Sequence, residues 1–206
     1  MFALSLTGFN NSTIPRDIKI IGDSAFHNCS GLTSISLPSS LTSIESSAFY
    51  RCSGLTGELN LGGCTSLTSI GSSAFWSCSR LTSISLPSSL TSIGNRAFYG
   101  CSGLTGELNL SNCTNLTSIG RDAFQYCSGL TSVDLSGCTS LTSIGSNAFQ
   151  NCSALESVVF PEGSTGWYVT TSSTATSGTD VDVTNSSTNA SNLNGQYRTY
   201  YWKRNA

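Results

Sequence analysis

Residues 81–101 read LTSISLPSSLTSIGNRAFYGC, and residues 32–52 read LTSISLPSSLTSIESSAFYRC. The second stretch differs from the first only at residues 45, 46, 47 and 51. Their common element I-G-x-x-A-F-x-x-C occurs six times, with Glu45 in place of Gly in one copy. The successive Ile residues are 23, 26, 23, 26 and 25 positions apart, and such a period predicts a solenoid of stacked coils. The six copies are Ile21–Cys29, Ile44–Cys52, Ile70–Cys78, Ile93–Cys101, Ile119–Cys127 and Ile144–Cys152.

Each coil contains two short β-prone phrases separated by turn residues. One phrase precedes the Pro or Gly turn, as in residues 32–37, and the other leads into Ile-Gly, as in residues 41–44. Alternating apolar residues bounded by Pro, Gly and Ser predict two strands per coil. The longer coils carry one more residue in residues 55–61 and two more in residues 62–66, so we expect a bulge and a longer turn there.

A single coil of about two dozen residues cannot enclose its own apolar side chains, whereas stacked neighbours about 4.8 Å apart can bury them in a continuous column. We therefore expect a ladder of buried phenylalanines, each contributing about 1.5–3 kcal/mol by its removal from water. The ladder consists of Phe26, Phe49, Phe75, Phe98, Phe124 and Phe149.

The repeat resembles the BspA-like, or treponemal-type, leucine-rich repeats, whose consensus is close to L-x-x-I-x-L-P-x-x-L-x-x-I-G-x-x-A-F-x-x-C. The resemblance extends from about Leu4 to Phe160, and it departs from the consensus at Glu45 and in the longer Gly-Cys or Asn-Cys turns. It implies a repeat solenoid: a curved, right-handed leucine-rich-repeat coil, mainly of short β-strands with turns or short helical turns. It also implies a bacterial, often host-associated, protein that is secreted or lies at the cell surface and binds other proteins without being an enzyme.

The repeat predicts a solenoid of about six to seven coils over residues 1–162, followed by a different segment over residues 163–206. Residues 170–194 are rich in Ser, Thr, Asn and Gly, which is typical of a linker. Aromatic β-prone stretches flank them at Trp167–Val169 and Tyr197–Trp202. Because a solenoid needs a cover on its terminal coil, we expect these stretches to pair in a β-rich cap; a stalk or attachment region is the alternative.

The nine cysteines follow the repeat. Six end the common element, and Cys64, Cys113 and Cys138 lie in the turns of longer coils. Stacked positions are close enough for disulfides, but an odd number cannot pair completely within the chain. The repetition favours buried free thiols that act as small, weakly polar core groups. Paired C-x-x-C elements are absent from the sequence, so no zinc site, and no other metal or cofactor, is expected.

Composition and spacing disfavour several other functions. A net charge of −2 with nine scattered basic residues provides no positively charged stripe for nucleic acid, and no apolar run is long enough to span a membrane.

Residues 1–6 do not form a signal peptide, and residues 3–8 already look like part of a repeat, so any export signal is expected upstream. His27, the one histidine, is interpreted as a surface substitution and not as a catalytic base or metal ligand. Glu58 and Glu107 occupy the same repeat position, so they should point the same way on an open face, whereas the two carboxylates of a glycosidase face each other across a cleft. We expect no enzyme activity.

The two residues after each repeated Phe vary between coils while the apolar positions hardly change. Stacking would align them into a ridge that carries aromatic residues and arginine, which are enriched at interface hot spots. The candidate partner-binding residues on this ridge are Tyr50, Arg51, Trp76, Tyr99, Gln125, Tyr126 and Gln150. The alternative is that these positions merely face solvent on a turn.

A second candidate surface is the strand face, whose small polar groups could hydrogen bond to a partner's backbone or to a glycan: Ser34, Ser36, Ser83, Ser85, Asn60, Asn109 and Asp134. The expected function is therefore a protein-binding or adhesion module. Its partner is a protein, for which a host matrix or cell-surface protein is a candidate, with a glycan as an alternative, and the expected state is a monomer. A structural spacer or surface-layer element without a dedicated ligand is the alternative function.

Overall fold

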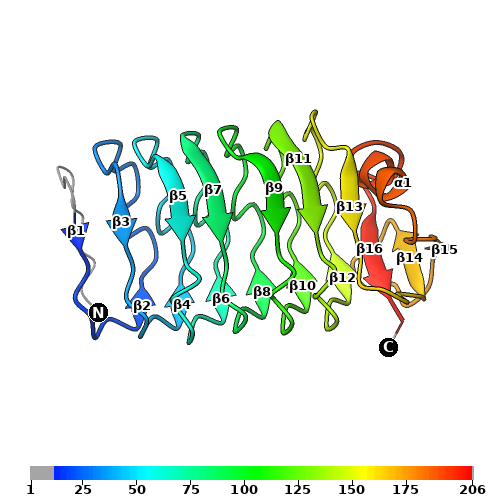
Figure 1. The fold of residues 1–206 in the computed structure, drawn as a ribbon, viewed down its shortest axis with the longest axis horizontal. Helices are drawn as coiled ribbons and strands as arrows, with labels where there is room; N and C mark the ends of the chain where they lie inside the picture. The colour runs from blue at the N-terminus through cyan, green and yellow to red at the C-terminus, as the bar shows by residue number, and fades with distance from the viewer. Residues whose placement is uncertain (1–11, 206) are drawn as a thin grey trace.

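The computed structural model describes residues 12–205 as a solenoid of stacked coils that ends in a smaller α/β segment (Figure 1). The predicted leucine-rich-repeat solenoid is confirmed for this part of the chain. Residues 3–8, which look like part of a repeat in the sequence, lie outside the described residues. Two strands occur in each coil of the stack, as the two β-prone phrases predict.

One side of the stack is a sheet formed from the strand that leads into Ile-Gly in each coil. These two-residue strands are parallel and in register, so that each Ser lies beside a Ser and each Ile beside an Ile from the second coil strand onward. Ser faces outward and Ile faces the core. The strands are β2 (Ile20–Ile21), β4 (Ser43–Ile44), β6 (Ser69–Ile70), β8 (Ser92–Ile93), β10 (Ser118–Ile119) and β12 (Ser143–Ile144).

The opposite side carries the strands that precede the Pro or Gly turn. They pair in parallel as β1 with β3, β5 with β7, and β11 with both β9 and β13. The register shifts at Gly57/Glu58 and at Leu130/Ser132, which confirms the expected bulge beside the longer coils. The strands are β1 (Ser12–Thr13), β3 (Ile35–Ser36), β5 (Gly57–Asn60), β7 (Leu81–Ser85), β9 (Thr105–Asn109), β11 (Gly129–Asp134) and β13 (Ser157–Val159).

Between the Ile and Cys of each common element, the chain forms a tight series of turns and no helix. Two positions per coil have a positive φ, as in Ser73 (56°) and Ser77 (54°). Alternate N–H groups then point along the stack: Ser73, Phe75 and Ser77 donate to carbonyls of the next coil, whereas Ala74 and Trp76 donate within their own coil. The strained left-handed residues are compensated by this ladder of hydrogen bonds between coils.

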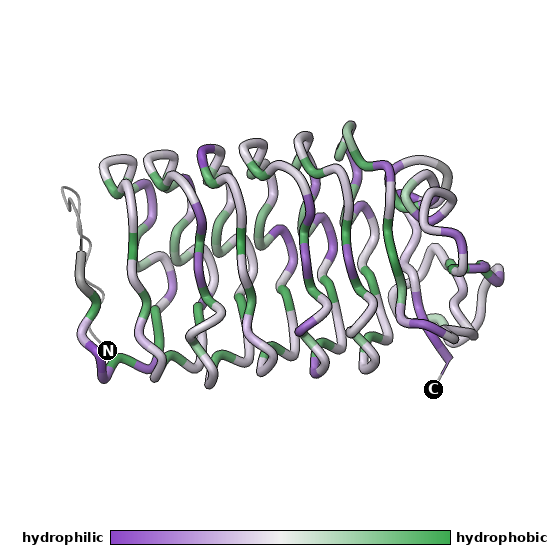
Figure 2. Tube along the Cα trace, in the orientation of Figure 1, coloured by the Kyte–Doolittle hydropathy of each residue, from purple (hydrophilic) through white to green (hydrophobic). Residues whose placement is uncertain are grey.

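The core consists of the apolar columns that the repeat predicts. The phenylalanine rings stack nearly parallel, with centroids 4.9 Å apart between Phe26 and Phe49 and 5.4 Å apart between Phe124 and Phe149. Phe49, Phe75, Phe98, Phe124 and Phe149 are completely buried. Figure 2 shows hydrophobic positions recurring in successive coils, with hydrophilic stretches between them.

Close backbone approach explains the glycine after Ile. A Cβ added to Gly71 would lie 2.6 Å from the carbonyl carbon of Glu45 in the preceding coil, and one added to Gly94 would lie 2.6 Å from that of Gly71. The coil of Glu45 accommodates a side chain at this position, and the carboxylate accepts a hydrogen bond from the hydroxyl of Ser43.

All nine cysteines are buried and none is joined in a disulfide, as the repetition predicts. The thiol of Cys78 donates to the carbonyl oxygen of Phe49 (3.2 Å), and that of Cys101 donates to the carbonyl oxygen of Phe75 (3.2 Å). Cys52, Cys127 and Cys152 make the same contact with the phenylalanine of the coil before them. Each of these five cysteines therefore links two coils through an S–H donor.

Residues 163–205 pack against the last coil. β16 (Tyr201–Arg204) pairs antiparallel with β12 on one edge and with β14 (Trp167–Thr170) on the other, and β15 (Thr179–Asp180) follows β14. Trp202 lies opposite Ile144 and is completely buried, so it continues the Ile column. The two aromatic stretches thus pair through Trp167–Thr170 and Tyr201–Arg204.

The polar stretch between these strands also contains helix, although its composition is typical of a linker. α1 (Ser186–Ser191) begins after Asn185, whose side chain accepts a hydrogen bond from the N–H of Thr188, and η1 (Asn192–Gln196) follows directly. The N-cap and the buried side chains of Asn189 and Ala190 account for a helix in a segment of linker-like composition.

We predict that Phe75→Ala lowers the free energy of unfolding by about 3–5 kcal/mol, because it leaves a cavity between two stacked rings. Urea denaturation followed by circular dichroism measures the change. The exposed Ser83→Ala is the control and should change stability by less than about 0.5 kcal/mol. A loss below 1 kcal/mol for Phe75→Ala would contradict a continuous packed ring column.

Thiol ionisation gives a second prediction. Burial raises the pKa of Cys52 from 9.0 to about 12, and it likewise raises those of Cys138 and Cys152 to about 12. The unfolded chain therefore releases these protons from about pH 9 upward, while the folded chain retains them. The contribution of these buried thiols to the free energy of unfolding is complete below pH 9 and is lost between pH 9 and about 12. The urea concentration at the midpoint of unfolding should therefore fall when the pH is raised from 8.5 to 10.5. A thiol reagent at pH 7.5 should label the native protein far more slowly than the urea-unfolded protein.

Candidate interaction surface

A second column of stacked rings lies outside the phenylalanine column, at the residue after each Phe. His27 and Tyr50 have centroids 4.9 Å apart at 2°, Tyr50 and Trp76 are 5.7 Å apart at 24°, and Trp76 and Tyr99 are 3.9 Å apart at 14°. Tyr126 meets the end of the column edge-on, 5.3 Å from Tyr99. The structure therefore brings these residues into one ridge, to which His27 contributes a ring.

The stacking decides which atoms of the ridge face outward. Tyr50, Trp76 and Tyr99 are half-buried because their ring faces contact each other, whereas Tyr126 is 45% exposed. Burial, together with the nearby Tyr126 and Asp122, raises the pKa of Tyr99. A partner would thus meet ring edges and hydroxyl groups, and only Tyr126 exposes much of a large aromatic side chain.

Two arginines flank the column. The guanidinium carbon of Arg51 lies 5.4 Å from the ring centroid of Tyr50, and that of Arg96 lies 5.8 Å from the ring centroid of Trp76. Both distances fall within the range of cation–π contacts. Arg51 is exposed and takes a left-handed conformation with φ of 54°, as Tyr126 does with φ of 63°. Both side chains therefore project from the same position of the turn.

The two glutamines of the predicted ridge are placed differently. The side-chain amide of Gln125 donates a hydrogen bond to the side-chain oxygen of Gln150, and Gln125 is only 9% exposed. In the last two coils this amide pair replaces the ring stack. Gln125 can offer little area to a partner, and Gln150, which is half-buried, remains at the edge of the ridge.

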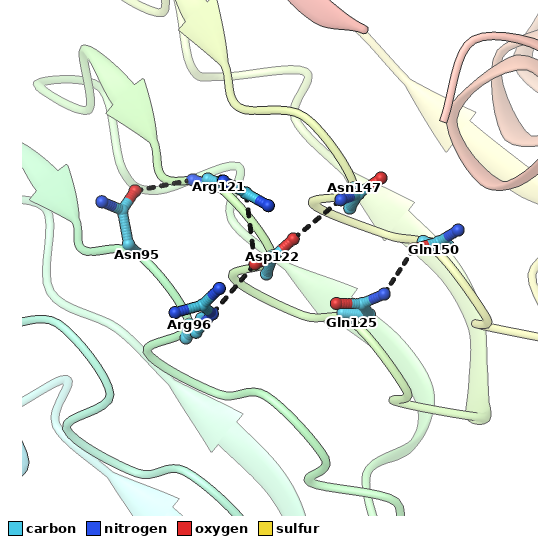
Figure 3. A network of polar contacts seen from close by, with 7 residues as sticks. All are labelled: Asn95, Arg96, Arg121, Asp122, Gln125, Asn147 and Gln150. Carbon is cyan, nitrogen blue, oxygen red and sulfur yellow. Dashed lines mark hydrogen bonds and ion pairs between the residues drawn. The ribbon is translucent and has the colours of Figure 1, made fainter. Parts of the chain in front are cut away.

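A network of polar contacts links three coils beside the ridge (Figure 3). The carboxylate of Asp122, which is almost completely buried, accepts from Arg96 Nε (2.9 Å) and from Asn147 Nδ2 (3.0 Å), and Arg121 Nε lies 3.4 Å from it. Asn95 Oδ1 accepts from the backbone N–H of Arg121 at 2.8 Å. The network replaces serines that occupy these repeat positions in earlier coils, and it holds Arg96 beside Trp76.

Arg96, Arg121 and Asp122 are not among the site residues predicted from the sequence. The signal is present in the sequence, because these are charged residues at positions that are Ser in the second and third copies of the repeat. Their pairing becomes apparent only when equivalent positions of adjacent coils are brought into contact.

On the strand face, the longer coils use several of the candidate polar residues in their own turns. Asn60 Oδ1 accepts from the N–H of Gly62, Asn109 Oδ1 from that of Ser111, and Asp134 Oδ1 from that of Ser136, at 2.8–3.0 Å. Asn60 also accepts from the hydroxyl of Ser85. These contacts give Asn60, Asn109, Asp134 and Ser85 structural roles at the ends of β5, β9, β11 and β7.

The residues weighed for chemistry do not converge. His27 is exposed and stacks on Tyr50, while Glu58 and Glu107 are exposed on β5 and β9 with β7 between them. Among residues 12–205, no group of three His, Cys, Asp or Glu side chains could hold a metal ion. No helix within the same range has the length and apolar character to cross a membrane.

Comparison with known proteins agrees with this architecture. The model of the BspA type leucine rich repeat region matches residues 1–105 and 68–192, with six copies. A leucine-rich repeat protein of Treponema pallidum is 29% identical, with a TM-score of 0.57 over 70% of this chain and 77% of the other. A leucine rich cell surface protein of Faecalibacterium prausnitzii is 25% identical, with a TM-score of 0.33 over 59% of this chain and 44% of the other. No curated protein matches the sequence.

We predict that Asp122→Ala lowers the free energy of unfolding by about 1.5–3 kcal/mol, because it removes charged hydrogen bonds and leaves the partners of a buried carboxylate unsatisfied. The exposed Asp23→Ala provides the comparison and should cost less, since its carboxylate accepts one exposed N–H, that of Ser46. Equal losses for the two variants, measured by urea denaturation, would show that the network does not stabilise the stack.

Proposed function

The chain belongs to the BspA-type leucine-rich repeat family, and we propose that it is a protein-binding or adhesion module of a bacterial surface or secreted protein. The partner is proposed to be a protein, with host matrix or cell-surface proteins as the candidates, bound by a monomer. The observation that carries this proposal is the outer ridge, in which tyrosines, a tryptophan and two arginines converge on one column.

The residue types of the ridge support binding. Tyr, Trp and Arg are the side chains most often found as interface hot spots, because they combine a large contact area with a polar end. The contacts with Tyr50 and Trp76 limit the motion of Arg51 and Arg96, so less side-chain entropy is lost when a partner binds. We place the centre of the proposed contact between Arg51 and Tyr126.

A structural spacer without a dedicated ligand is the second candidate function, and a specific observation favours it. The rings of the ridge stack on each other at 3.9–5.7 Å, so much of their apolar area already stabilises the coil stack. If stabilising the stack were the only role of these rings, removing the most exposed side chains of the ridge would not change the binding of any partner protein.

The experiment separates these functions with substitutions that the backbone tolerates. Position 100 of the ridge is a glycine with φ of 69°, so Arg51→Gly and Tyr126→Gly remove side chains while retaining a conformation that the repeat already uses. Surface plasmon resonance would test the chain against purified extracellular-matrix proteins and detergent-extracted epithelial surface proteins. Ser77→Gly is the matched control on the ridge, and Arg80→Ala is the control away from it.

We expect the double variant Arg51→Gly, Tyr126→Gly to weaken binding of a captured partner at least tenfold, with both controls unchanged, because we propose both side chains as hot spots of the contact. Thermal melting verifies that the fold is retained. If the double variant binds like the controls, the ridge is not the contact surface. If no panel protein binds, the spacer function replaces the proposal.

A further inference from the structure

A groove of about 930 Å³ lies between the last coils and the C-terminal segment. Its floor is formed by the outward-facing Ser118 and Ser143 of β10 and β12. Arg121 contributes to one side, and Ser173–Thr176, from the loop between β14 and β15, contribute to the other. Such a volume is in the range of small-ligand sites.

The loop that forms one wall is attached to the sheet beneath it. The hydroxyl of Tyr168 donates to the carbonyl oxygen of Ala175 at 3.2 Å, and the ammonium group of Lys203 donates to the same oxygen at 3.0 Å and to that of Ser173. Two neighbouring strands thus hold the loop above the sheet, so the groove exists before a ligand binds.

The groove is positively charged within a protein of net charge −2. Arg121, Lys203 and Arg204 line it, and none of its lining residues is Asp or Glu. Asp122, which pairs with Arg121, is buried and also pairs with Arg96, so these three groups retain one net positive charge. Asp180 lies beside Tyr168 on β15 and is exposed outside the lining.

The cations retain donors for a ligand. Lys203 uses two of its three N–H groups on the loop, and the guanidinium of Arg204 donates from Nε to Thr165 and from Nη1 to Thr139, which leaves other N–H groups of its five. These contacts orient both side chains and reduce the entropy lost on binding an anion.

The floor is suited to a hydroxyl-rich ligand and not to a peptide strand. Ser118, Ser143 and Lys203 are register partners on adjacent strands, so hydroxyl, hydroxyl and ammonium groups lie in one row. β10, β12 and β16 are each paired with strands on both sides, so this part of the sheet offers no open edge for β-strand addition.

We propose that this groove binds a short acidic oligosaccharide, with its carboxylates on Arg121, Lys203 and Arg204 and its hydroxyl groups on the serine row. The groove shares no lining residue with the proposed protein-binding ridge. It is formed by residues of the fourth, fifth and sixth common elements and of the C-terminal segment, and its ligand is selected by charge and hydroxyl pattern.

The test measures binding of the whole chain by isothermal titration calorimetry. The probes are a tetrasaccharide of alternating glucuronic acid and N-acetylglucosamine, a neutral N-acetylglucosamine tetramer, and a hexaglutamate peptide. The key variant is Arg121→Gln, which leaves Arg96 and Asn147 on Asp122 and the backbone N–H on Asn95. Arg80→Gln is the matched control, since Arg80 is an exposed arginine that does not line the groove.

We expect the acidic tetrasaccharide to bind, the neutral tetramer to bind at least tenfold more weakly, and Arg121→Gln to weaken binding about fivefold while Arg80→Gln does not. Raising NaCl from 0.05 to 0.5 M should weaken binding further. Lys203→Met is a second variant, with thermal melting to verify the fold. Absence of saccharide binding, equal binding of the neutral tetramer, tighter binding of hexaglutamate, or an unchanged affinity for Arg121→Gln would each overturn the proposal.

Discussion

The stacking of identical positions at a spacing of about 5 Å is the constraint on which this structure depends. A side chain in one coil meets its own counterpart in the next, so a residue is suitable only if it packs against a copy of itself. Flat phenylalanine rings meet this condition, with interplanar angles of 2–8° along the whole column. The parallel Ile and Ser rows and the left-handed turn positions follow from the same condition.

The constraint also accounts for the unusual composition, which is low in charge and rich in Ser and Thr. Like charges stacked in a column would repel each other, whereas a small hydroxyl can donate to the coil before it. Thr68 bonds to the carbonyl oxygen of Thr42 through both its N–H and its hydroxyl group, and Thr91 does the same to Thr68. At the end of the stack, the N–H of Arg204 donates to the carbonyl oxygen of Thr142, which in earlier coils would accept from the next coil. Around Asp122, charged residues of adjacent coils stack because opposite signs meet.

The period, the two strands per coil, the bulges, the phenylalanine column and the buried cysteines without disulfides were all predictable from sequence, because each depends on the spacing of residues within one repeat. The burial of Gln125 was not, because its partner is Gln150 in the next coil and the amide pair replaces a ring stack. The positive φ angles were also beyond prediction, since most occur at Ser, Asn, Arg or Asp and not at glycine. The helix α1 depends on contacts of Asn189 with Val158 and Val183, which linker-like composition conceals.

The groove illustrates the limit of reasoning from a repeat. Arg121 belongs to the fifth common element, whereas Lys203 lies in a strand that resembles no repeat, and only the antiparallel pairing of β16 with β12 brings them to one site. A regular stack presents the same chemistry at every coil, so it favours extended contacts such as those proposed for the ridge. Where the repetition ends, strands of a different sequence continue the sheet and a loop folds back over it. The end of the solenoid is therefore the place where this fold forms an open groove whose lining differs from that of the repeated coils, and it is also where three of its nine basic residues lie together.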